Sequence, residues 1–202
     1  ELEEAALIDG AGDMKVLFTG GGTAGHINPA LAVAGYLRKK EPDTEILYVG
    51  NRGGMEERLV AKAGYPMQTI TISGFQRRIT PKNLMRNAQT VVRMFTASSE
   101  AHRIIKEFAP DVCVGTGGYV SGPLIREAAR LHIPCVIHES NAYPGVTTRM
   151  LAKSVHAVML AVPDAKNYFD PSVNCIVTGN PVRGEVLSAQ REESRKALGL
   201  DE

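Results

Sequence analysis

Short apolar runs alternate with segments of helical periodicity from Met14 onward. The apolar runs are bounded by glycine, proline or polar residues, and they predict strands at Lys15–Thr19, Glu45–Val49, Met67–Ile72, Asp111–Val114, Pro134–His138, His156–Leu160 and Asn174–Thr178. The helical patterns between them predict helices at Pro29–Lys40, Met55–Ala63, Pro81–Phe108 (with a break), Pro123–Leu131, Val146–Lys153 and Asp164–Phe169. This β-α-β repetition predicts an α/β fold, a doubly wound Rossmann-like parallel sheet with helices on both faces.

The pattern differs at the two ends of the chain. Residues 1–13 are acidic and precede Met14, so we expect a tag remnant, a linker or the end of an upstream segment. Residues 14–183 are expected to form one Rossmann-like domain. Residues 184–202 form a polar, helical stretch that predicts the start of a linker leading out of a finished domain.

Glycine-rich or polar turns follow four of the predicted strands. They read GGGTAGH (20–26), GTGGYVSGP (115–123), HESN (138–141) and GNPVR (179–183). The carboxyl ends of parallel strands meet on one rim of the sheet, so these turns predict one composite site. A strand that runs into glycines and then a helix presents backbone N–H groups to an anion. His26 adds a titratable group within reach of that anion.

Composition narrows the possible partners. The formal net charge of +1 argues against nucleic acid as a bulk electrostatic partner. No apolar run approaches the roughly 20 residues of a bilayer span. The cysteines Cys113, Cys135 and Cys175 are odd in number and lie far apart in apolar surroundings, which predicts buried free thiols in a reducing cytosol.

The first turn also matches the dinucleotide fingerprint G-x-G-x-x-G, at Gly20, Gly22 and Gly25. That fingerprint requires an acidic residue at the end of the second strand for the ribose. The sequence there has no carboxylate, although Arg52 offers a charge for a 2′-phosphate. An NADP-dependent oxidoreductase therefore remains an alternative, one that leaves the second glycine turn and HESN unexplained.

Four stretches taken together, GGGTAGHINPALA, GTGGYVSGP, HESNAYPGVTTRMLA and VTGNPVR, resemble the MurG family of glycosyltransferases. The resemblance covers Met14 to about Val186 and implies one half of a GT-B fold. It implies transfer of N-acetylglucosamine from UDP-N-acetylglucosamine to lipid I (undecaprenyl-diphospho-MurNAc-pentapeptide), with inversion and without metal. The chain is then the N-terminal, acceptor-binding domain, inactive without a donor domain. The alternative within this resemblance is a non-catalytic, membrane-recruiting subunit of a two-chain transferase.

The resemblance also implies roles for individual residues. His26 is the expected base that takes the proton of the acceptor hydroxyl; a histidine that hydrogen-bonds a loop carbonyl is the other interpretation. The residues expected to bind the donor are Thr23, Ala24, Gly25, Asn141 and Arg183. The family commonly reads GGTGGH where this chain has Ala24, and a methyl group fits there if the φ angle is negative.

The acceptor and its diphosphate are expected to contact a second group of residues. They are Gly21, Gly22, Gly117, Gly118, Tyr119, Ser121, His138 and Glu139. Two interpretations stay open for Glu139, a group that orients the site or binds a sugar hydroxyl, and a structurally paired buried carboxylate. No cluster has metal-ligand spacing, so neither a metal nor a cofactor is expected.

The segment 75–95 (FQRRITPKNLMRNAQTVVRMF) mixes basic and apolar residues and has no acidic residue. Such a composition suits docking on an anionic membrane leaflet, whereas the alternative is an amphipathic helix packed on the sheet. The residues expected in this patch are Phe75, Arg77, Arg78, Ile79, Lys82, Leu84, Met85 and Arg86. The implied location is the cytoplasmic face of the cell membrane, with other cell-wall synthesis proteins as possible partners.

Overall fold

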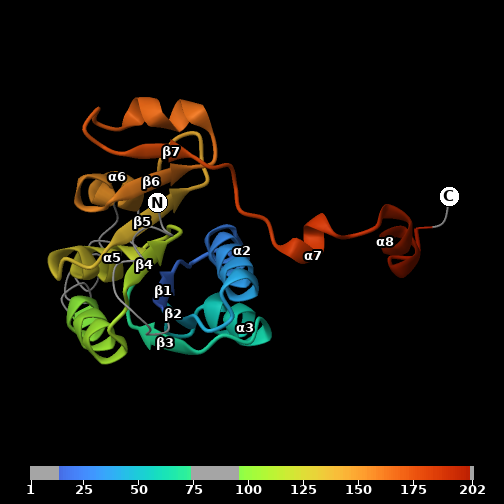
Figure 1. Ribbon diagram of the computed structural model, residues 1–202, viewed down its shortest axis with the longest axis horizontal. Coiled ribbons are helices and arrows are strands. Elements are labelled where there is room, and N and C mark those ends of the chain that lie inside the picture. The colour runs from blue at the N-terminus through green and yellow to red at the C-terminus, as the bar shows by residue number, and fades with distance from the viewer. Residues whose placement is uncertain (1–13, 74–95, 201–202) are drawn as a thin grey trace, which may run out of the picture.

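The computed structural model describes residues 14–73 and 96–200. Within these residues the chain forms a parallel sheet in the order β3-β2-β1-β4-β5-β6-β7 (Figure 1). The strands are β1 (Lys15–Thr19), β2 (Glu45–Asn51), β3 (Met67–Ile70), β4 (Val112–Gly115), β5 (Cys135–Glu139), β6 (Ala157–Leu160) and β7 (Cys175–Val177). The predicted fold class, a Rossmann-like parallel sheet, is confirmed.

Helices lie between consecutive strands and also follow the last strand. They are α2 (Ala24–Lys40), α3 (Met55–Lys62), α5 (Ser121–Arg130), α6 (Val146–Leu151), α7 (Gly184–Leu187) and α8 (Arg191–Ala197), with the 3-10 turns η1 (Ala152–Ser154) and η2 (Pro163–Tyr168). Residues 96–108 are also helical. The first half of the predicted helix Pro81–Phe108 lies outside the described residues. Among the described residues, no helix combines the length and the apolar character needed to cross a bilayer.

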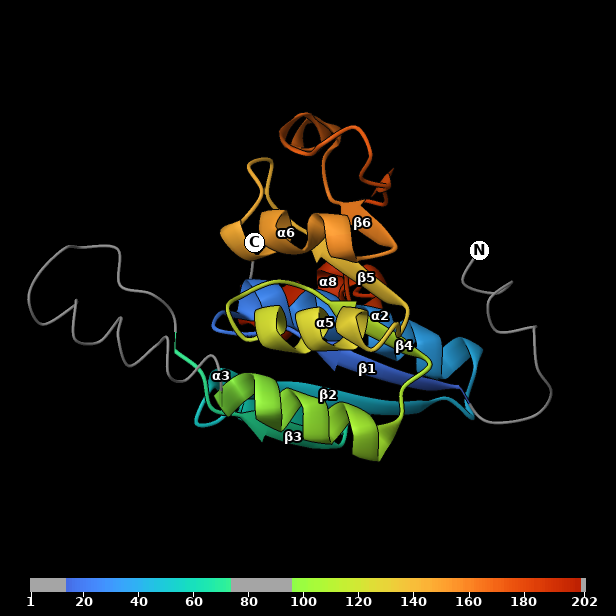
Figure 2. The same cartoon turned by 90° about the vertical axis from the view of Figure 1, so that its left-hand side faces the viewer.

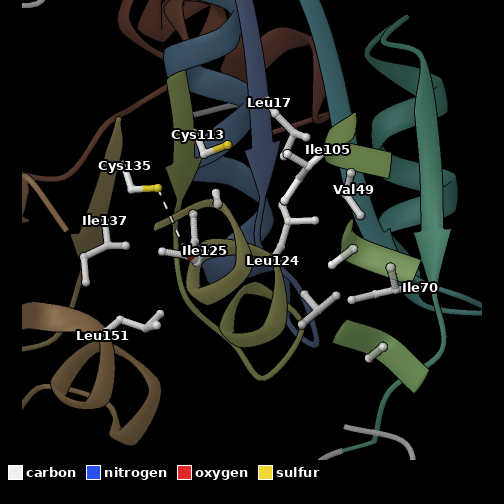
Figure 3. Close-up of a cluster of buried hydrophobic side chains, with 14 of the residues drawn as sticks. Leu17, Val49, Ile70, Ile105, Cys113, Leu124, Ile125, Cys135, Ile137 and Leu151 are labelled. Carbon is white, nitrogen blue, oxygen red and sulfur yellow. Dashed lines mark hydrogen bonds between the residues drawn. The ribbon is translucent and has the colours of Figure 1, made fainter. Parts of the chain in front are cut away.

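Side chains alternate between the two faces of the sheet and build a separate core on each. Leu17 belongs to one core and Phe18 to the other, and both are completely buried. The first core packs under α5, α6 and the helix over residues 96–108, which cover one face of the sheet (Figure 2). In this core Leu124 and Ile125 point from α5 toward the sheet, where the buried thiols of Cys113 and Cys135 lie (Figure 3).

The second core lies under α2 and α3. It contains Ile27 and Ala30 of α2 and Val60 of α3, packed against the opposite faces of the same strands. The described cysteines are free thiols, as predicted, but Cys175 at the sheet edge is only partly buried. Edge strands have one covered flank fewer than central ones, so this thiol keeps some exposure.

The strand order places the first and fourth strands side by side. Thr19 at the end of β1 aligns with Gly115 at the end of β4. The chain leaves β1 toward one face of the sheet and leaves β4 toward the other, because α2 and α5 belong to different cores. A crevice outside the strand ends is expected where connections diverge in this way, and it is the usual ligand site of such sheets.

The predicted start of the first helix was wrong. Helix α2 begins at Ala24 and not near Pro29, which lies inside the helix. Proline there removes only the N–H that would reach Gly25, one turn back, so the helix begins before it. The polar stretch after Arg183 forms two short helices, and α8 has no buried residue. These helices extend away from the sheet (Figure 1).

Candidate functional site

Three different elements hold the first glycine loop, which follows β1. The hydroxyl of Tyr48, from β2, donates to the carbonyl oxygen of Gly20 at 2.7 Å. The N–H of Gly21 donates to the carbonyl oxygen of Gly117 in the second loop at 3.3 Å. The N–H of Gly22 donates to Oε1 of Glu56, from α3, at 3.0 Å. The loop therefore has a defined conformation set by β2, α3 and the second loop.

This arrangement changes which amides face a ligand. The amides predicted to bind diphosphate included those of Gly21 and Gly22, and both donate to protein oxygens here. Ala24 and Gly25 open α2 and are exposed, so their N–H groups have no carbonyl one turn earlier in the helix. The outward-facing donors of this loop thus begin at α2, where the helix dipole also favours negative charge. Ala24 is helical, so its φ is negative and its methyl group fits.

The second glycine loop, which follows β4, packs directly on the first. Gly118 has a φ of +80°, and a Cβ added there would overlap the carbonyl oxygen of Gly21. Only glycine satisfies both conditions. The hydroxyl of Ser121 donates to the carbonyl oxygen of Gly118 at 2.9 Å and closes this loop onto α5.

The ring of Tyr119 lies against Gly22 and joins the two loops. Its hydroxyl accepts a hydrogen bond from Nδ2 of Asn51 at 3.4 Å, while Oδ1 of Asn51 accepts from the N–H of Ile72. Burial, and then the charge of Glu56, raise the pKa of Tyr119, so its hydroxyl stays protonated and able to donate. Asn51 ends β2, where a dinucleotide-binding fold carries its ribose-binding acid, and its amide is already engaged. This geometry does not favour the NADP interpretation.

His26 lies in the first turn of α2 and points at the second loop. Its Nδ1 is 3.1 Å from the carbonyl oxygen of Thr116, and the Thr116 hydroxyl donates back to the carbonyl oxygen of His26 at 2.6 Å. A carbonyl oxygen only accepts, so Nδ1 must carry the proton. The neutral ring then has its lone pair on Nε2. Both interpretations of His26 are therefore compatible, since the loop-carbonyl contact fixes the tautomer that a base requires.

The third loop, after β5, is organised by Glu139. Its Oε1 accepts from the N–H and from Nδ2 of Asn141, at 3.0 and 2.7 Å, and its Oε2 accepts from the N–H of Gly145 at 2.8 Å. Burial acts to raise the pKa of Glu139, but hydrogen bonds from Thr148, Gly145 and Asn141 outweigh it and leave the pKa below its ordinary value. Glu139 is therefore a charged, internally paired group that positions Asn141.

His138 connects β5 with the turn after β7. It is buried, and its Nε2 donates to the carbonyl oxygen of Gly179 at 3.1 Å. Burial lowers the pKa of His138, although the Gly179 contact and the Glu139 charge act against that shift. A neutral, buried ring is thus part of the framework under the GNPVR turn. Arg183 lies at the end of this turn, exposed, immediately before α7.

The structure therefore brings the first two glycine loops into direct contact around His26, Tyr119 and Ser121, at the ends of neighbouring strands. The predicted membrane patch lies outside the described residues. Sequence reasoning missed four residues that hydrogen-bond one or other of the two loops from another part of the chain, Glu56, Tyr48, Asn51 and Thr116. The sequence carried one signal for Glu56, a carboxylate at the second position of the predicted helix Met55–Ala63, which follows Gly53-Gly54.

Several known proteins are similar to this chain in sequence or in fold. A family model described as "Glycosyltransferase family 28 N-terminal domain" matches residues 16–160. Two similar relatives are named UDP-N-acetylglucosamine--N-acetylmuramyl-(pentapeptide) pyrophosphoryl-undecaprenol N-acetylglucosamine transferase. The one from Acetivibrio thermocellus is 46% identical over 93% of this chain and 50% of its own length. The one from Lactococcus lactis is 47% identical over 87% of this chain and 48% of its own.

Solved structures with a similar fold were also found. The crystal structure of Acinetobacter baumannii MurG matches 83% of this chain and 46% of its own, with a TM-score of 0.68 and 30% identity. A UDP-GlcNAc 2-epimerase from Neisseria meningitidis matches with a TM-score of 0.61 at 15% identity, which shows a shared fold only. The chain spans about half the length of the curated relatives it matches. With its parallel sheet, its paired glycine loops and a match over residues 16–160, the chain belongs to the family of glycosyltransferase family 28 N-terminal domains.

Proposed function

We propose that this chain is the acceptor-side domain of a MurG-type transferase. In this proposal the enzyme moves N-acetylglucosamine from UDP-N-acetylglucosamine to lipid I and forms lipid II for peptidoglycan, with inversion and without metal. The names of the relatives support the reaction. Because the chain matches about half of each relative, a donor domain is expected to supply most contacts to the nucleotide sugar.

The observation that carries the proposal is the environment of His26. The Thr116 carbonyl oxygen holds the proton on Nδ1, so a neutral His26 offers Nε2 as a base. The N–H groups of Ala24 and Gly25 lie in the same first turn of α2 as His26. A base next to an anion site is what glycosyl transfer requires, since one substrate loses a proton while the other releases a diphosphate.

The proposed step follows from these positions. Nε2 of His26 takes the acceptor hydroxyl proton as that oxygen bonds to the anomeric carbon of N-acetylglucosamine. The bond from the sugar to UDP breaks, and UDP leaves with the electron pair. The N–H groups of Ala24 and Gly25 stabilise its growing charge, and Arg183 adds a guanidinium suited to diphosphate. Asn141, oriented by Glu139, keeps its side-chain oxygen for a sugar hydroxyl.

The test uses this chain fused to the C-terminal half of the Acetivibrio thermocellus relative. We expect the fusion to release UDP when given UDP-N-acetylglucosamine and a short-chain lipid I analogue. His26→Ala should lower kcat by about 10²- to 10⁴-fold, the usual contribution of a general base. The control is His132→Ala, since His132 is exposed in the turn after α5. Near-normal turnover in His26→Ala would remove His26 as the base.

Peripheral attachment to the anionic inner leaflet is part of the proposal. Its support is the basic and apolar composition of residues 75–95. The strand that precedes this segment in the chain, β3, ends on the rim that carries the glycine loops. Charge reversal at Arg77, Arg78 and Lys82 should weaken binding to vesicles that contain phosphatidylglycerol. Unchanged binding would contradict the membrane docking.

A further inference from the structure

Glu56 is a buried acid that the proposed reaction does not use. It is the second residue of α3 and is completely buried. Its Oε1 accepts the N–H of Gly22, a residue 34 positions earlier in the chain. Its Oε2 is also buried and has no hydrogen-bond donor among the described residues. A carboxyl group with one oxygen satisfied and the other unsatisfied is unfavourable in a protein interior.

The glycine at position 21 leaves space for the Glu56 carboxyl group. A Cβ added to Gly21 would overlap Oε1 of Glu56, so the loop approaches the carboxyl group closely because Gly21 has no side chain. The start of α3 supplies some compensation, since a helix N-terminus favours negative charge. An apolar residue would fill the same space without the desolvation cost. The acid therefore has a use other than packing.

That use follows from what Glu56 does to Gly22. The bond turns the N–H of Gly22 inward, toward α3, at a residue whose φ is +82°. The amide of Gly21 is turned toward Gly117 in the same way. Thr23 follows as the N-cap of α2, and Ala24 and Gly25 are exposed in its first turn. The Glu56 carboxyl group thus separates two sets of N–H groups. Those of Gly21 and Gly22 donate to protein oxygens, and those at the start of α2 face solvent.

We propose that Glu56 is a positioning residue that holds the first glycine loop through the Gly22 amide and thereby presents the start of α2 to the donor diphosphate. The identity of the ligand rests on the proposed function, whereas the role of Glu56 in the loop does not. The required group is an acceptor for one N–H. Glutamine at this position should therefore work, and alanine should not.

The first measurement is amide hydrogen exchange by NMR on the 202-residue chain. In Glu56→Ala, exchange of the Gly22 N–H should accelerate about tenfold, the factor expected for one lost hydrogen bond, while core amides of β5 stay protected. In Glu56→Gln, the rate should stay within about twofold of wild type. Val60→Ala is the matched control, because Val60 is completely buried on the same helix but does not belong to the loop.

The second measurement uses the fusion with the donor half described above. Glu56→Ala should raise KM for UDP-N-acetylglucosamine several-fold more than Val60→Ala does, and Glu56→Gln should restore it. Unchanged Gly22 exchange in Glu56→Ala, or equal acceleration in Val60→Ala, would overturn the positioning role. Altered exchange with an unaltered KM would overturn the link to the diphosphate. A wild-type fusion without transferase activity would count against the proposed function and leave the exchange result to decide the role of Glu56.

Discussion

Two loops on the rim of the sheet are each organised by a buried glutamate, and the two glutamates are satisfied to very different degrees. Glu139 receives hydrogen bonds on both oxygens, from Asn141 and Gly145 of its own loop. Glu56 receives one hydrogen bond, from Gly22, which comes before α2 in the chain whereas Glu56 comes after it. The second oxygen of Glu56 has no donor among the described residues. Both side chains are almost fully removed from solvent.

The difference shows what a buried carboxylate contributes in each place. Glu139 is surrounded by donors, so its charged form is stabilised and its pKa is lowered in spite of burial. It fixes a short loop locally. Glu56 has a single partner and ties two segments that are distant in sequence. The first arrangement depends on charge, whereas the second depends on one acceptor at the right point. Substitutions that separate charge from hydrogen bonding should therefore affect the two sites differently.

The largest expected effect comes from Gly118→Ala, which acts on the contact between the first and second loops. The new methyl group would overlap the carbonyl oxygen of Gly21 at a residue whose φ is +80°, so we expect a loss of about 3 kcal/mol in the free energy of unfolding. Chemical denaturation measures this loss. NMR shifts should change around Gly22 but not at Asn141, because the Glu139 loop is held by its own residues.

Gly122→Ala is the matched control for that substitution. Gly122 lies in α5, four residues further on, and a Cβ there would meet only Thr147, at 3.5 Å. Alanine in a helix is favoured over glycine, so stability should stay the same or rise by about 0.5 kcal/mol. Equal losses in the two variants would show that the loop contact does not explain the effect of Gly118→Ala.

Glu139→Gln comes next in size. The groups that surround the carboxylate are all donors, from Asn141, Gly145 and Thr148, so the amide NH₂ of glutamine would face another donor. We expect a loss of about 2 kcal/mol, the cost of leaving buried donors unsatisfied. Denaturation at neutral pH gives the value, and Asn141 should show the largest NMR shifts. A loss of less than about 0.5 kcal/mol would contradict the charge-dependent role of Glu139.

The same contrast explains how much the sequence could predict. The strands, the fold class and the four rim turns follow from local patterns of apolar residues and glycines. Glu139 was a candidate because it stands beside His138 in the HESN turn, and its partners belong to the same stretch of chain. Glu56, Tyr48 and Thr116 reach the loop from other elements, and such contacts exist only after the strands have been ordered. Pro29 misled the prediction of the α2 start because proline is more frequent at the beginning of a helix than within it.

A smaller effect is expected from pH through His138. Burial lowers the pKa of His138 in the folded protein, whereas the unfolded chain has the ordinary value near 6.5. The folded state therefore binds fewer protons, so the stabilising contribution is present above pH 6.5 and is lost as pH falls through the folded pKa. His138→Gln can still donate to the Gly179 oxygen but cannot titrate. Its free energy of unfolding should fall less than that of wild type between pH 7 and pH 5.

His132→Gln is the control for the pH experiment, because His132 is exposed in the turn after α5. The pH dependence of its unfolding free energy over the same range is the reference for the removal of an exposed histidine. If the unfolding free energy of His138→Gln falls with pH as steeply as that of wild type, the His138 ring is not protonated preferentially on unfolding.

The smallest expected effect, and the sharpest contrast with Glu139, is Glu56→Gln. Glutamine keeps an oxygen for the N–H of Gly22, and its NH₂ takes the place of an oxygen that has no donor among the described residues. It also removes the cost of burying a charge, so the free energy of unfolding should change by less than about 0.5 kcal/mol or increase. The same chemical change thus costs about 2 kcal/mol at one rim glutamate and almost nothing at the other. Denaturation of both variants under one condition measures the difference, and equal losses would mean that the charge of Glu56, rather than its single hydrogen bond, holds the first loop.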